Sequence, residues 1–524
     1  MTPPRLRAPR EGGGVLAEPP LAQVAALLAH NRGEFLSARV RILDQPLTEL
    51  RLRARSEAWA AASRYLAEAG EPLPPAPSLD QPWLLAGHQP DLFHPGVWVK
   101  HFALHGLAQA HDGFSLNLVV DNDAAKPPLL HLPAGEHVVS VPYDHWQGES
   151  PYEDRRVVDE ALFATLPQRI QPHVTGWPFA PLLPALWREA MQQRDATPLL
   201  GERIARARRA IERKWGCTQA EVPLSRLCQG EAFACFACHL VSDARRLLTV
   251  YNDAVHHYRQ RYRLKSTFHP VPDLAEEGDW TELPLWAWRT GQRRRARLFV
   301  HSTATEVQLR AGGETWPALK SGGDLLEQWR TLEAGGFKVR TRALTTTLFA
   351  RLLLGDLFIH GIGGAKYDEL ADVLIARFFG CPVPAFLTLS ATLLLPLPRY
   401  PVNGEMCRAI GRQHRDLWYN PQRYFPEGQG SMEAAQLVRA KQAWIGRATA
   451  SRAERKARFV ALRGLNDRLR AFLFIQEEAL RHQRDQCRER VRINAVLGRR
   501  DYAFCLYPEA MLCEFMQRFQ RATG

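Results

Sequence analysis

Apolar residues along the chain form short continuous runs that alternate with helical spacings, and this alternation predicts a parallel sheet. Residues 83–86 (WLLA) and 115–120 (SLNLVV) are runs of the length expected for buried strands. Between them, the apolar residues of 96–108 recur at helical spacing. A strand, a helix and a second strand in this order are typical of a parallel βαβ unit. Residues 136–141 predict a further strand.

A second unit of the same kind is expected downstream. Residues 352–360 (LLLGDLFIH) are apolar and strand-like, although their start suits the end of a helix equally well. A glycine-rich turn follows, and then a helix with apolar residues three and four positions apart. Gly380 and Pro382 predict where this helix ends.

The remaining segments divide into helical and mixed stretches. Residues 1–20 predict a loose tail, 21–70 a helical segment, and 151–265 a mainly helical region. Residues 283–345 contain the strand candidates LPLWAW, ARLFVH and TEVQLR. From about residue 430 to 497 the chain is free of proline and helical in pattern, which indicates a helical hairpin or a coiled coil.

The composition is that of a globular protein, with 46% hydrophobic and 23% charged residues. The length of 524 residues is enough for two or three domains. The first fifteen residues hold no apolar run that would serve as a signal-peptide core, and no stretch of about 18 apolar residues occurs. We therefore expect a cytoplasmic protein without a membrane span. Its nine cysteines are expected to be reduced thiols.

The net charge of +13 is carried mainly by arginine, in residues 289–297 and across residues 451–500. Such a balance suits an anionic substrate, a nucleic acid or an acidic membrane surface. Charge runs are more typical of solvated helix faces, so nucleic acid is not the expected partner. A nucleic-acid-binding protein that uses these helices remains a rival hypothesis.

Three loops are the candidate sites, because ligands of open α/β sheets bind beyond the carboxyl ends of the strands. Loop 87–95 contains Gly87, His88, Gln89 and His94. Its histidines suit acid–base chemistry, or phosphate binding beside a helix N-terminus. The alternative is a capped turn with an exposed histidine.

The second loop, residues 121–127, places Asp121, Asn122 and Asp123 at a strand end, where carboxylates suit an amine or a divalent cation. An Asx turn is the alternative. Just before the third loop, Arg340 and Arg342 suit a substrate carboxylate, and equally a helix cap or a surface position.

The third loop is residues 360–368. Its candidate residues are His360, Gly361, Gly363, Gly364, Lys366, Tyr367 and Asp368. The glycines would let backbone N–H groups approach an anion, Lys366 would add a charge, and Tyr367 a phenol. The spacing is neither a Walker A loop nor a dinucleotide fingerprint, and a plain tight turn is the alternative.

Two other patterns receive a structural interpretation. Cys235, Cys238 and His239 match the haem-attachment pattern, but there is no export signal and no second ligand pair at zinc spacing. We expect packed thiols, with neither haem nor zinc. Trp286 and Trp288 beside arginines would suit base stacking, although core or hairpin packing is favoured.

The order of these motifs, from about residue 80 to the C-terminus, resembles the BshC family of bacillithiol-synthesis cysteine ligases. The matching residues are Gly87, His88, Gln89, Phe93 and Gly96; Asp121 and Asp123; Gly361, Gly363, Gly364 and Tyr367; Gly380, Pro382 and Pro384; and Ser390, Ala391, Thr392 and Leu393. The chain departs from the family at His88, where a glutamine is usual, and at Asn122, where a histidine is usual. It also has Ala124, Ala125 and Lys126 in place of acidic residues.

The resemblance implies an α/β fold: a Rossmann-like parallel-sheet core, interrupted by inserted and mostly helical connecting segments, with a C-terminal helical coiled-coil domain that pairs subunits. The expected segments are a tail and helical segment (1–75), the first half of the core (76–150), the connecting insertion (151–335), the second half of the core (336–425), and the coiled coil with the C-terminal segment (426–524).

The implied activity is the addition of cysteine to an amino-sugar malate, or to a related small acidic substrate, with ATP or ADP as the nucleotide. A catalytically inactive scaffold is the other rival, suggested by the His88 and Asn122 departures. The catalytic candidates are His88, Gln89, His94, Asp121 and Asp123. We expect the two outer loops to meet at one cavity, with His88 and Lys366 facing it and Asp121 or Asp123 on its wall.

Overall fold

The computed structural model describes residues 6–78, 80–425 and 431–521. The chain forms two compact units, described here separately: unit 1 is Met1–Leu132, Ser140–Leu395 and Arg500–Gly524, and unit 2 is Pro133–Val139 and Pro396–Arg499. The expectations for residues 1–5 of the tail, and for 426–430 and 522–524 of the last segment, lie outside the described residues. None of the described helices is long and apolar enough to cross a membrane.

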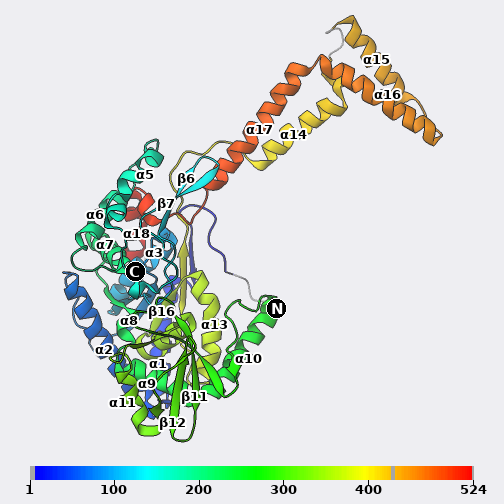
Figure 1. The fold of residues 1–524 in the computed structure, drawn as a ribbon. Coiled ribbons are helices and arrows are strands. Elements are labelled where there is room, and N and C mark those ends of the chain that lie inside the picture. The colour runs from blue at the N-terminus through cyan, green and yellow to red at the C-terminus, as the bar shows by residue number, and fades with distance from the viewer. Residues whose placement is uncertain (1–5, 79, 426–430, 522–524) are drawn as a thin grey trace. The chain divides into compact units, whose positions relative to one another are not determined.

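The centre of unit 1 is a six-stranded sheet in the order β1-β17-β16-β4-β5-β8. Figure 1 labels β16, one of its middle strands. The strands are β1 Val15–Glu18, β4 Trp83–His88, β5 Phe114–Val119, β8 Ala220–Pro223, β16 Leu357–His360 and β17 Leu387–Ala391. All neighbours are parallel except β1, which is antiparallel to β17. From β4 the chain adds β5 and then β8 on one side of the sheet. It then adds β16 and β17 on the other side of β4, so the direction of winding reverses between β4 and β16.

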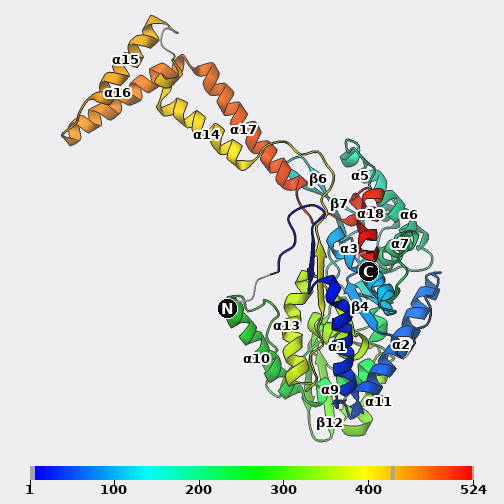
Figure 2. The same ribbon diagram turned by 180° about the vertical axis from the view of Figure 1, so that it is seen from behind.

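Two strands of this sheet correct the sequence expectations. Part of the predicted loose tail is β1, whose pairing with β17 is visible in Figure 2 as a dark-blue strand beside a yellow one. The predicted helical region contains β8, a buried four-residue strand (AEVP) that pairs with β5. Both strands are too short to show a period, and their sheet partners hold them extended.

Helices cover both faces of the sheet. On one face, α3 (Pro95–Ala110) packs over β4, β5, β16 and β17, and α18 (Glu509–Arg521) packs against α3. The other face contributes Leu85, Leu116 and Val222 to a large hydrophobic core shared with α2 (Leu47–Glu68), α9 (Glu231–Ser242) and α13 (Ile362–Arg377). The remaining helices of unit 1 are α1 Val24–Ser37, α4 Glu160–Ala164, α5 Leu166–Val174, α6 Leu183–Gln192, α7 Leu200–Lys214, α8 Leu224–Leu227, α10 Ala244–Tyr262, α11 Leu325–Thr331 and α12 Ala343–Phe349.

A second, antiparallel sheet is inserted before β16, in the order β13-β12-β11-β10-β15, with β9 and β14 at its margins. Its strands are β9 Glu276–Glu277, β10 Trp280–Arg289, β11 Ala296–Ser302, β12 Glu306–Ala311, β13 Glu314–Thr315, β14 Leu319–Lys320 and β15 Phe337–Thr341. The three predicted strands are confirmed as β10, β11 and β12. Two small hairpins complete the strands, β2 (Arg41–Ile42) with β3 (Gln45–Pro46), and β6 (Leu129–Ala134) with β7 (His137–Pro142).

The α-helices in the described part of unit 2 are α14 Gly404–Tyr419, α15 Met432–Gly446, α16 Arg452–Ala471 and α17 Phe474–Leu497. The predicted helical stretch is therefore three helices, in which α15 and α16 form a hairpin while α17 packs along α14. A disulfide between Cys407 and Cys487 joins α14 to α17, which corrects the expectation of nine reduced thiols. The other seven cysteines are free.

Candidate active site

A cavity of about 400 Å³ lies beyond the carboxyl ends of β4, β5, β16 and β17. Loops 87–95 and 360–368, some 270 residues apart, both line it, as their positions after parallel strands predict. The candidate residues on its wall are Gly87, His88, Gln89, His94, Asn122, Asp123, His360, Gly361, Gly363, Gly364 and Tyr367. The parallel register of β4 with β5 and with β16 explains why these loops meet.

His94 and Gly96 set the start of α3 at the cavity. The His94 Nδ1 accepts the Gly96 N–H at 3.0 Å and caps the helix. Burial and the charge of Arg500 lower the pKa of His94 to about 4, so the ring is neutral at pH 7. A Cβ on Gly96 would lie 2.0 Å from the carbonyl oxygen of Ala391, so this approach of α3 to β17 requires glycine.

Partly buried His88 and fully buried Lys100 place a base and a cation at the cavity. The Lys100 Nζ donates to the Gly87 carbonyl at 2.9 Å, and burial lowers the pKa of Lys100 to about 8. Burial and the Lys100 charge hold the pKa of His88 well below its usual value. The imidazole of His88 is therefore neutral at pH 7 and can accept a proton from a bound group.

Asp123 is the carboxylate on the cavity wall, and two side chains hold it. The Gln89 Nε2 donates to Asp123 at 2.8 Å, and the Arg295 Nη1 lies 3.2 Å from its other oxygen. Arg295 also donates to the Asn122 carbonyl, and its guanidinium lies 4.6 Å from the ring centroid of Trp286. The loop after β5 therefore presents a fixed carboxylate beside a cation.

The N-terminus of α13 also lines the cavity. Gly361 precedes the helix and provides no side-chain cap, so the first N–H groups of α13 are available to an anion. The His360 Nε2 lies 2.6 Å from the Asp368 carboxylate, which also pairs with Arg351 at 2.7 Å. Burial would raise the pKa of Asp368, but His360 and Arg351 outweigh it and lower that pKa to about 2. Asp368 is thus a charged group that orients His360.

Lys366 does not face this cavity, contrary to the sequence expectation, and of the two aspartates expected as candidates for its wall, Asp123 lies there and Asp121 does not. Lys366 is exposed and lines a different cavity with Glu369 and Tyr262, because it projects from another side of α13 than Tyr367. Asp121 is buried, and it accepts hydrogen bonds from the N–H and hydroxyl of Ser225. It therefore anchors the turn after β8, while its neighbours Asn122 and Asp123 reach the cavity.

The two arginines expected to bind a carboxylate have partners within the protein. Arg340 is buried and pairs with Glu153 and Glu333. Arg342 pairs with buried Glu282 at 2.8 Å, and its guanidinium lies over Trp286. Neither lines the cavity: Arg340 lies in β15 and Arg342 directly precedes α12, and each guanidinium pairs with a carboxylate of the protein instead.

The sequence analysis did not predict several residues that line the cavity: Lys100, Trp286, Arg295, Thr346, Thr347, Ser390 and Arg500. Lys100 could have been identified from the sequence, because a lysine among the apolar residues of a predicted helix is unusual in a core. The sequence pattern does not distinguish Arg295, because it lies in a run of arginines that also resembles a solvated loop. Arg500 comes from the segment before α18, whose return to unit 1 no local pattern indicates.

The buried residues of metal-ligand type already have partners within the protein. His101, Glu212 and Glu221 are clustered, but the Arg208 guanidinium lies between the two carboxylates, 2.8 Å from Glu212 and 2.6 Å from Glu221. Cys235 and Cys238 are fully buried in α9 within the hydrophobic core. Burial raises the pKa of Cys235 to about 12, so that thiol is a poor source of the thiolate that metals bind.

Comparison with known proteins adds no family assignment. No protein-family model matches the chain, and a search of curated proteins finds no match to it.

Proposed function

We propose that the chain is a BshC-like, ligase-type enzyme that joins an amine to a carboxylate in this cavity. The observation that carries the proposal is that one cavity is lined by the cations Lys100 and Arg500, by the N-terminus of α13, and by the Asp123 carboxylate that Gln89 and Arg295 hold in place. A substrate with one anionic end and one ammonium end is complementary to such walls.

The sheet order supports a Rossmann-like core. Numbered along the chain, the parallel strands lie in the order 5-4-1-2-3, which is the doubly wound order seen from its other end. Ligands of such sheets bind at the point where the winding reverses, and here that point lies between β4 and β16. The cavity occupies this position.

In the proposed enzyme each group has a role set by its chemistry. The N-terminus of α13 and Arg500 hold the anionic part of one substrate. Asp123, held by Gln89 and Arg295, receives the ammonium group of the other. Neutral His88 takes the proton that the amine loses as it attacks, and Lys100 stabilises negative charge beside it.

Amide formation in water requires an activated carboxylate, so a nucleotide such as ATP is part of the proposal. The free N–H groups at the start of α13, Arg500 and Lys100 are donors that suit phosphate oxygens, and Gly361 and Gly363 have open space at their Cβ positions. A bound nucleotide would supply the leaving group for the acyl transfer. In the family that the chain resembles, the substrates would be cysteine and an amino-sugar malate.

The test is a mass-spectrometric assay of the purified chain with cysteine, glucosaminyl malate and ATP. The proposal expects a product whose mass is that of the two substrates less one water. His88→Ala is expected to lower kcat/KM by roughly 10²–10⁴-fold, because it removes the proton acceptor. Lys366→Ala, also in a candidate loop but outside the cavity, is the matched control and should retain activity.

Both variants should keep the melting temperature within a few degrees of the parent, since the described contacts of His88 are a ring contact with Phe93 and one with the Gln89 carbonyl. Equal loss of activity in the two variants, or no turnover and no thermal shift with any of the three compounds, contradicts this assignment.

The coiled-coil pairing of subunits is a further part of the proposal. Large apolar side chains of unit 2 are exposed, among them Phe459 (65%), Phe474 (65%) and Ile475 (81%). Exposed apolar groups of this size are typical of an interface, and we expect a homodimer by light scattering. Phe474→Glu with Ile475→Glu should give a monomer, whereas Phe268→Ser, at an equally exposed phenylalanine of unit 1, should not. A parent chain that stays monomeric at high concentration would refute the dimer.

A further inference from the structure

The positive charge of the chain is concentrated in unit 2. Residues 396–499 contain 21 lysines and arginines against 10 aspartates and glutamates, a net charge of +11 out of the +13 of the whole sequence. The parallel sheet and its cavity belong to the nearly neutral remainder. A charge segregated in this way attracts a polyanion to one part of a protein.

Within unit 2 the arginines form an ordered groove. Arg408, Arg412 and Arg415 lie at positions i, i+4 and i+7 of α14, on one exposed face of the helix. Across the described ranges, none of the three forms an ion pair. Arg484 and Arg488 line the same groove from α17 and share one partner, Asp485, at 3.1 and 3.9 Å. Among the described ion pairs, the five arginines of the groove therefore have one carboxylate partner, which two of them share.

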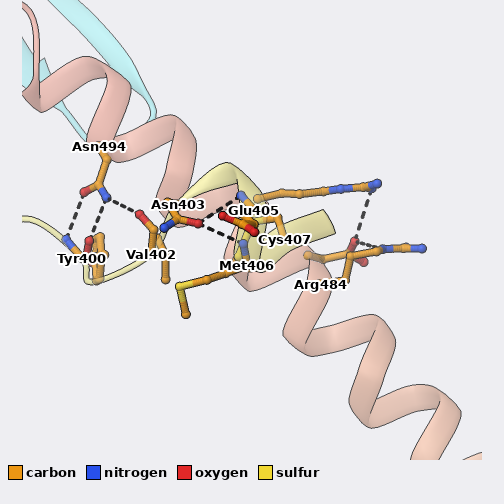
Figure 3. Close-up of a disulfide and its surroundings, with 11 residues drawn as sticks. Tyr400, Val402, Asn403, Glu405, Met406, Cys407, Arg484 and Asn494 are labelled. Carbon is orange, nitrogen blue, oxygen red and sulfur yellow. Dashed lines mark hydrogen bonds and ion pairs between the residues drawn. A yellow bond between two sulfur atoms is a disulfide. The ribbon is translucent and has the colours of Figure 1, made fainter. Parts of the chain in front are cut away.

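The disulfide holds the two rows of arginines together. Cys407 and Cys487, with Cα atoms 5.6 Å apart, join α14 to α17 one residue from Arg408 and one from Arg488. Figure 3 shows Arg484 of α17 beside the start of α14, where the Asn403 side chain caps the helix. Asn494 of α17 bonds the backbone of Tyr400 on the approach to α14. The groove is therefore a constrained surface rather than a set of independent side chains.

Aromatic rings lie at the far end of the groove. Trp418 is 39% exposed, with the Arg470 guanidinium over its ring, and Tyr419 is 61% exposed. Exposed rings next to a basic track are the combination that binds single strands, because phosphates contact the arginines while bases stack on the rings. From Arg408 to Tyr419 the helix rises about 16 Å, a length over which a single strand of a few nucleotides can contact both the arginines and the rings.

From these observations we propose that the α14–α17 groove binds a short segment of single-stranded nucleic acid. The proposal is independent of the ligase-type activity, which uses residues of unit 1 alone. Fluorescence anisotropy of the full chain with a labelled oligothymidylate of about ten nucleotides tests it. We expect the logarithm of the association constant to fall with the logarithm of salt concentration at a slope of about −2 to −3.5, as three to five phosphate contacts require.

Amino-acid substitutions distinguish binding in the groove from a general attraction by positive charge. Arg412→Glu with Arg415→Glu should weaken binding at least about tenfold, and Tyr419→Ala about fivefold or more, whereas Tyr419→Phe should bind like the parent. Arg463→Glu, at an exposed arginine of α16 outside the groove, is the charge control and should change affinity less than about threefold. Equal effects of the groove and control variants overturn the proposal, as does no binding at low salt. Tighter binding to duplex DNA or to anionic lipid vesicles than to the single strand also overturns it.

Discussion

Replacement of Glu212 by alanine is expected to destabilise unit 1 by about 3–5 kcal/mol, the usual effect of removing one partner from a buried ion pair. Glu212 is completely buried, and its carboxylate contacts Arg208 at 2.8 Å, His101 at 2.7 Å and the Trp98 indole N–H at 2.6 Å. Without it, the Arg208 charge is left with Glu221 alone, and the indole N–H loses its acceptor. Because Trp98 and His101 belong to α3, the start of that helix at the cavity should loosen as well.

Urea denaturation followed by tryptophan fluorescence measures this loss. Glu514→Ala is the control, because Glu514 forms an exposed i,i+4 pair with Arg518 on α18, and such pairs contribute less than about 0.5 kcal/mol. A Glu212→Ala protein with a midpoint close to that of the Glu514→Ala protein would show that Arg208 and His101 find other partners, contrary to the expectation.

Replacement of Asp121 by asparagine is expected to stabilise the fold at pH 8 and to leave it unchanged near pH 4. Burial, and next the charge of Glu153, raise the pKa of Asp121 to about 7, although two hydrogen bonds from Ser225 oppose the shift. The unfolded chain releases this proton at a pH of about 3.9. The stability contributed by the protonated carboxyl is therefore fully present below pH 4 and is lost as pH rises through 7.

Asparagine is neutral at every pH and can still accept a hydrogen bond from the Ser225 N–H. The Asp121→Asn protein should therefore not lose this stability as the pH rises. The stability advantage of Asp121→Asn should grow between pH 4 and 7 and approach a value of the order of 4 kcal/mol above pH 7. Denaturation curves of parent and variant at pH 4.5, 6 and 8 check the prediction. A difference in unfolding free energy between parent and variant that stays the same at all three pH values would mean that Asp121 is ionised in the folded protein over this whole range.

The sequence predicted that loops 87–95 and 360–368 would line one cavity, and the structure places both of them there. Apolar runs followed by glycine, histidine and a helix identified β4 and β16, and parallel strands bring such loops to one edge of a sheet. The same reasoning failed for Lys366, because a loop assignment does not say which side of the following helix each residue takes. Nor could it decide between Asp121 and Asp123 for the cavity wall, since the burial of Asp121 against Ser225 depends on β8, a strand whose four residues carry no period.

The sequence by itself determined the elements whose physical cause is local: the long strands and helices, the helix end at Gly380, and the concentration of arginine near the C-terminus. Tertiary structure alone decided what depends on partners distant in the chain. It paired β1 with β17, returned Arg500 to the cavity, and enclosed Arg340 between Glu153 and Glu333. It also brought Cys407 and Cys487 together from 80 residues apart. An arginine in a sequence has the same charge in each of these places, and only its neighbours determine whether it lines a cavity, neutralises a buried acid or faces solvent.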